Sequence, residues 1–108
     1  MNLQLSERAR RVLSRLRPES DLAESIEAIA IDALRMRLRE CIEKIGGFEA
    51  RYGRGFEQFA ADWKSGRLAD RYSHPLERDY MEWEALTIER QELLDLIHEL
   101  AGPSRADL

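Results

Sequence analysis

The sequence predicts a mainly α-helical protein in which a short N-terminal strand is followed by four helices. Apolar residues recur at three- and four-residue steps through most of the chain, which is the spacing of one helix face. Charged residues make up 35% of the chain, and this high content suits long exposed helices. With 108 residues, the chain can build one modest hydrophobic core.

The start of the chain, residues 1–17, is predicted to form the strand and then the first helix. In "NLQLS" two leucines alternate with polar residues, which is the periodicity of a strand. Ser6 can cap the following helix, because its hydroxyl accepts hydrogen bonds from unpaired backbone N–H groups. Pro18 ends this helix near Arg17, since a proline disfavours helical backbone in the residue before it.

The second predicted helix runs from residue 21 to residue 52, with Ser20 as its cap. A helix of that length is about 48 Å long, which is more than a compact domain of this size needs. We therefore expect it to lie against something else. Gly46 and Gly47 interrupt its apolar stripe. Each glycine destabilises a helix by about 1 kcal/mol relative to alanine, so the pair predicts a weak point or a bend.

Glycine, serine and proline residues mark the two remaining helices. The third is expected to begin at Gly55 and to end near Gly66, which can adopt a left-handed terminal conformation. The fourth is expected to be capped by Ser73, to run to about Ala101 and to be ended by Gly102.

The sequence carries no pattern that is typical of an enzyme. Two histidines, His74 and His98, lack the spacing of a zinc-binding helix, and Cys41 falls on the apolar stripe of the second helix, where a buried, reduced thiol is expected. We therefore expect no catalytic, metal or cofactor site and no small-molecule substrate. No apolar run is long enough for a membrane span, and no secretory signal is recognisable, so a cytoplasmic protein without membrane contact is predicted.

Charge is distributed unevenly along the chain. Residues 1–17 carry a net charge of +4 and residues 82–108 a net charge of −5. This asymmetry suggests one anionic and one cationic partner, although simple charge scatter in a helical protein is the alternative.

Aromatic residues are concentrated between residues 52 and 63 and in the first half of the fourth helix. Such residues are enriched both in cores and at the centres of protein interfaces. Two interpretations therefore remain open at this point. The third helix folds onto the fourth to make a small core, or part of the cluster stays exposed and anchors a protein partner.

Residues 1–40 combine a short alternating strand, a helix, a tight connection and a longer helix, and this order resembles the ribbon-helix-helix DNA-binding fold. The resemblance implies that residues 1–45 form a dimer whose paired strands enter the major groove of operator DNA. It would place these residues at the DNA: Asn2, Gln4, Arg8, Arg10, Arg11 and Ser20. A helical hairpin after an unstructured start is the alternative.

The pattern Tyr-Gly, two residues, Phe, two residues, Phe, followed after a linker by Trp-Glu-Ala, resembles a group of small prokaryotic antitoxin-like proteins. Here the pattern is carried by Tyr52, Gly53, Phe56 and Phe59 and by Trp83, Glu84 and Ala85. The resemblance implies that residues 46–108 are a helical partner-binding part that neutralises a small nuclease-type toxin. The residues expected at the toxin are Tyr52, Phe56, Phe59, Trp63, Tyr80, Glu82, Trp83, Glu84, Glu89 and Glu92.

The two resemblances together imply a dimeric antitoxin, not an enzyme, that binds its cognate toxin and also its own operator DNA. Two alternatives remain: a helical scaffold or dimeric interaction protein with no toxin partner, and a transcriptional regulator that acts alone.

Overall fold

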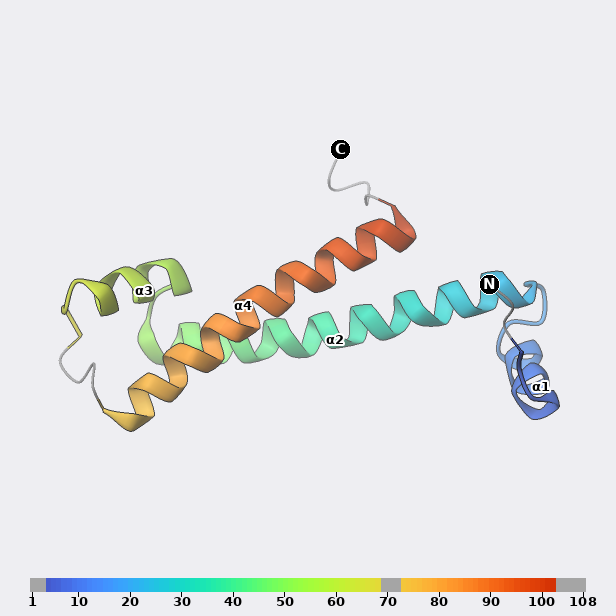
Figure 1. The fold of residues 1–108 in the computed structure, drawn as a ribbon, viewed down its shortest axis with the longest axis horizontal. Coiled ribbons are helices and arrows are strands. Elements are labelled where there is room, and N and C mark those ends of the chain that lie inside the picture. The colour runs from blue at the N-terminus through green and yellow to red at the C-terminus, as the bar shows by residue number, and fades with distance from the viewer. Residues whose placement is uncertain (1–3, 69–72, 103–108) are drawn as a thin grey trace.

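The structure, a computed structural model, describes residues 4–68 and 73–102. These residues form four helices, which are α1 (Glu7–Leu16), α2 (Leu22–Tyr52), α3 (Phe56–Lys64) and α4 (His74–Ala101). α4 runs back across α2, α3 lies at the end where α2 finishes, and α1 lies at the opposite end, beside the start of α2 (Figure 1). The prediction of a mainly helical protein is confirmed for this part of the chain.

The predicted N-terminal strand is wrong. Gln4 and Leu5 lead into α1 without pairing to another strand, and residues 4–68 and 73–102 contain no strand at all. Asn2 and Leu3 lie outside the described residues. An isolated strand of about five residues has no stability of its own, and the described part of this chain provides no second strand for it to pair with. The ribbon-helix-helix architecture, which requires that strand, is therefore contradicted.

Local sequence signals set the helix ends. Ser6 and Ser73 cap α1 and α4 as predicted, and the hydroxyl of each accepts a hydrogen bond from the backbone N–H three residues further on. α2 starts one residue later than expected, because Asp21 rather than Ser20 is its cap. Gly53 ends α2 with a φ of 65°, a left-handed conformation that glycine adopts without steric cost.

α2 dominates the shape of the molecule. It is one continuous helix of 31 residues, about 46 Å long, and it passes through Gly46 and Gly47 and through the expected boundary between residues 45 and 46 without a break. The radius of gyration is 19.7 Å, compared with about 13 Å for a compact domain of this length. No described helix combines the length and the apolar character that a membrane-spanning segment needs.

The hydrophobic core lies at one end of this elongated molecule, where α2, α3 and α4 meet (Figure 1). α2 and α4 supply most of it, and α3 closes it with one phenylalanine. Its buried members are Cys41, Ile45, Phe48, Phe59, Trp83, Leu86 and Leu93. The first half of α2 contributes none of these residues, so the chain is packed at one end and open at the other.

Candidate functional site

The aromatic cluster is the centre of the core. Phe59 and Trp83 are both 0% exposed. The Trp83 ring lies 4.9–5.8 Å from the ring centres of Phe48, Tyr52, Phe56 and Phe59. The indole N–H of Trp83 is buried and has no hydrogen-bond partner among the described residues. These rings hold α3 against α2 and α4, and the two most buried offer no surface to a partner in this state.

The outer edge of the cluster is more accessible. Trp63 on α3 packs against Tyr80 on α4, with ring centres 4.8 Å apart, and both side chains are half-buried. The four glutamates expected at a partner all lie on α4. Glu82, Glu84 and Glu92 are exposed, whereas the partly buried Glu89 accepts a hydrogen bond of 3.2 Å from Arg37 on α2.

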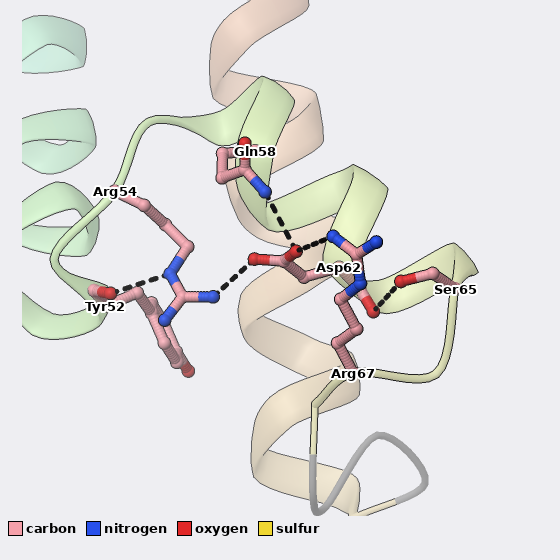
Figure 2. Close-up of polar contacts among 6 residues, drawn as sticks. All are labelled: Tyr52, Arg54, Gln58, Asp62, Ser65 and Arg67. Atoms are coloured by element: carbon pink, nitrogen blue, oxygen red, sulfur yellow. Dashed lines mark hydrogen bonds and ion pairs between the residues drawn. The ribbon is translucent and has the colours of Figure 1, made fainter.

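A buried carboxylate, which the sequence patterns above do not single out, fixes the join between α2 and α3 (Figure 2). Asp62 is only 5% exposed and is ion-paired with Arg54, which also donates from Nε to the carbonyl oxygen of Tyr52 over 3.0 Å. Gln58 donates to the other carboxylate oxygen over 2.9 Å, and Arg67 lies 3.7 Å from it. The i, i+4 spacing of Gln58 and Asp62 was the only local signal for this cluster.

The environment of Asp62 keeps it ionised. Burial by itself raises the pKa of this carboxyl, but the hydrogen bonds from Gln58 and Arg54 and the positive charges of Arg54 and Arg67 outweigh burial, so the pKa lies below its ordinary value. All the groups around the carboxylate are donors, and none is free to take a proton from a substrate. The cluster therefore orients α3 relative to the end of α2.

A second polar contact ties the end of α2 to α4. The hydroxyl of Tyr52 donates to the carboxylate of Asp79, and Arg51 donates to the same oxygen over 2.7 Å. Burial raises the pKa of Tyr52, and its hydrogen bond to Asp79 raises that pKa further. Tyr52 thus belongs to the core through its ring and to the surface through its hydroxyl.

Cys41 is a buried thiol, as predicted. It is 2% exposed and donates a hydrogen bond of 3.1 Å to the carbonyl oxygen of Leu86 on α4. Burial raises the pKa of this thiol, which keeps it in its unreactive protonated form. Among the described residues, no three His, Cys, Asp or Glu side chains are grouped as a metal site requires.

At the open end of the molecule, α4 diverges from α2 (Figure 1), and a largely apolar groove of about 610 Å³ lies between the two helices. Leu96 of α4 is 47% exposed there, although it is a large aliphatic side chain. The groove is lined by Ala30, Ala33, Leu34, Arg37, Leu96, Glu99 and Leu100. We call this surface the open groove. It is concave and apolar and is rimmed by one cation and one carboxylate.

α1 presents a second uncovered apolar surface. Val12 and Leu16, one turn apart, are 57% and 64% exposed. Arg8, Arg11 and Arg15 lie on the same face as Val12. We call these five residues the basic face of α1. α1 contacts the start of α2 through its opposite side, so the basic face stays open.

The residues expected at DNA are only partly brought together. Arg8, Arg10 and Arg11 are exposed on α1, and Gln4 is exposed just before it. Ser20 is half-buried beside the cap of α2. Asn2 lies outside the described residues, so the structure does not place it.

Comparison of this chain with protein-family models, with curated proteins and with solved structures found no match.

Proposed function

We propose that this chain is a helical interaction protein that binds an amphipathic helix in the open groove. The observation that carries the proposal is the groove itself, an apolar concavity of about 610 Å³ between two helices, whose lining includes two exposed leucines of α4, Leu96 and Leu100. Laying the apolar face of a helix into such a groove is a common mode of protein recognition.

The division of the molecule into a packed end and an open end supports this proposal. The core at the packed end and the contacts of Asp62 and Asp79 hold α2, α3 and α4 together. The core thus sets the direction in which the arms of α2 and α4 diverge, while the arms themselves stay uncovered and available to a partner.

A charged residue in the groove tests the proposal. Leu96→Glu places a carboxylate on the apolar surface, and Met81→Glu is the matched control, because Met81 is an exposed residue of α4 outside the groove. We expect the wild-type chain and Met81→Glu to associate, either with another copy in sedimentation velocity or with labelled amphipathic helical peptides in fluorescence anisotropy. Leu96→Glu should do neither. Equal association by Leu96→Glu, or no association by the wild type, would refute the proposal.

The antitoxin role implied by the resemblance is a second candidate function. The exposed carboxylates of α4, Glu82, Glu84 and Glu92, favour it, because exposed carboxylates suit a cationic partner surface. If the role is right, co-expression of this chain should rescue cells from a small basic protein encoded beside it that is toxic alone. Replacing the three glutamates by glutamine should abolish the rescue while the urea-unfolding midpoint stays unchanged.

A further inference from the structure

We infer that the occupant of the open groove is the basic face of α1 from a second copy of this chain, so that two chains exchange their first helices in a symmetric dimer. This inference rests on the proposed function and names its partner. Three observations carry it: matching side-chain patterns, opposite charges, and the distance along α2 between the two surfaces.

The side-chain patterns of the two surfaces are alike. On α1, Val12 and Leu16 are one turn apart, and Arg8, Arg11 and Arg15 lie on the same side of the helix. On α4, Leu96 and Leu100 are also one turn apart and share their face with Glu92 and Glu99. Each surface is thus a pair of exposed aliphatic residues flanked by charges.

The charges of the two surfaces are opposite. The basic face of α1 carries three arginines, whereas Glu99 lines the groove and the exposed Glu92, four residues before Leu96, lies on the same face of α4. The one cation in the groove, Arg37, is already paired with Glu89 over 3.2 Å. The groove therefore presents uncompensated negative charge toward a helix that enters it.

α1 is held away from the groove of its own chain. It lies beyond the start of α2 at the far end of the molecule (Figure 1), whereas the groove begins at Ala30 and ends beside Leu34 and Arg37. From Leu22 to Leu34 the rise along α2 is about 18 Å. The α1 of a second chain can reach this groove while both α1 and α2 stay helical.

A two-fold arrangement brings both pairs of surfaces together. If the first halves of two α2 helices run antiparallel, with Leu22 of one beside Leu34 of the other, each α1 reaches the groove of the opposite chain. The contact is then reciprocal and closed, as in most homodimers. Ile26 and Ile29 lie near its centre, where the exposed Ile29 gains cover.

A charge exchange between the two surfaces tests the inference. One variant carries Arg11→Glu and Arg15→Glu, and the other carries Glu92→Lys and Glu99→Lys. All four positions are exposed, so circular dichroism should show unchanged helix content. The dimer Kd of each variant alone should rise by about tenfold or more in sedimentation equilibrium, because each contact occurs twice and attraction becomes repulsion. An equimolar mixture should form a one-to-one dimer near the wild-type Kd.

The mixture separates the alternatives. If α1 covered the groove of its own chain, mixing would restore nothing, and the inference would be wrong. Unchanged dimerisation by both variants, with loss of binding to duplex DNA by the α1 variant, would assign the arginines to nucleic acid and also overturn it. A chain that stays single but binds helical peptides in a manner blocked by Leu96→Glu would refute the exchange and leave the proposed function standing. Arg35→Glu with Arg39→Glu, two exposed arginines of α2 that do not line the groove, is the control for net charge.

Discussion

Arg54, in the connection between α2 and α3, is ion-paired with the buried carboxylate of Asp62 on α3. The same guanidinium donates to the carbonyl oxygen of Tyr52, the last residue of α2. One side chain therefore ties together the end of one helix and the last turn of the next. The aromatic core depends on this join, because Phe59 enters the core from α3.

The first prediction concerns acid stability. The pKa of Asp62 in the folded chain lies below its ordinary value of 3.8, so its ionised form stabilises the fold above that pH. This contribution is lost as the pH falls from 3.8 through the folded-state value. Asp62→Asn should lower the urea-unfolding midpoint at neutral pH and should flatten its decline in acid. Asp95→Asn, at an exposed carboxylate bonded to Gln91, should leave both measurements close to wild type. Identical acid profiles for wild type and Asp62→Asn would contradict the assignment.

The second prediction concerns the glycines of α2. A Cβ at Gly46 or Gly47 meets no atom within 4 Å, and both lie inside a continuous helix. Alanine at either position should raise the free energy of unfolding by about 0.5–1 kcal/mol. Gly53→Ala is the contrasting variant and should lower it by about 1 kcal/mol, because its φ of 65° is costly for alanine. Urea unfolding followed by circular dichroism measures all three, and a loss of stability at Gly46 or Gly47 would show that the backbone there is needed for close packing.

The third prediction separates core from interface in the aromatic cluster. Phe59 is fully buried, so Phe59→Ala should cost about 3–5 kcal/mol of unfolding free energy. Met81→Ala, at an exposed position, should change it by no more than about 0.5 kcal/mol. Tryptophan fluorescence during urea unfolding reports both values. A Phe59→Ala chain of normal stability that fails to bind a partner would instead place this ring at an interface.

The fourth prediction concerns the thiol. Cys41 is buried, and its pKa is raised above the ordinary 9.0, so little thiolate is present at neutral pH. An aromatic disulfide reagent should label it at least about tenfold more slowly in the native chain than in urea. The control moves the cysteine by one residue, to the exposed position of Ile42, in a Cys41→Ala background. That thiol should react equally fast with and without urea.

The helices could be predicted from the sequence because their ends are set locally. Ser6 and Ser73 act through hydroxyls that reach a backbone N–H three residues away, and Gly53 and Gly102 act through their own backbone, so their positions in the chain suffice. The N-terminal strand failed for the opposite reason. Alternation over five residues shows which side chains would share a face of a strand, but a strand also needs a second strand to pair with. The described part of the chain contains none.

The site was harder to foresee because it depends on residues far apart in sequence. The buried carboxylate of Asp62 is ion-paired with Arg54, which approaches it across the turn after α2. Only Gln58, four residues before Asp62, has a sequence spacing that indicates a contact. The open groove depends on how far α4 diverges from α2, a property of packing and not of either helix alone. The length of α2 predicted that this helix would lie against something else, and Ile29 and Ala33 are indeed exposed on it, but the groove that forms beside them could not be read from the sequence.

The uneven packing of α2 has a consequence for the lifetime of a lone copy. Its second half is locked into the core, but its first half is a rod with little tertiary support, and such segments open most readily. Arg35 and Arg37 lie at the end of that first half with their side chains exposed, within reach of trypsin-like proteases whenever it unwinds. A chain in the dimer should therefore be cleaved more slowly than a monomeric chain, so the rate of proteolysis would report the degree of dimerisation.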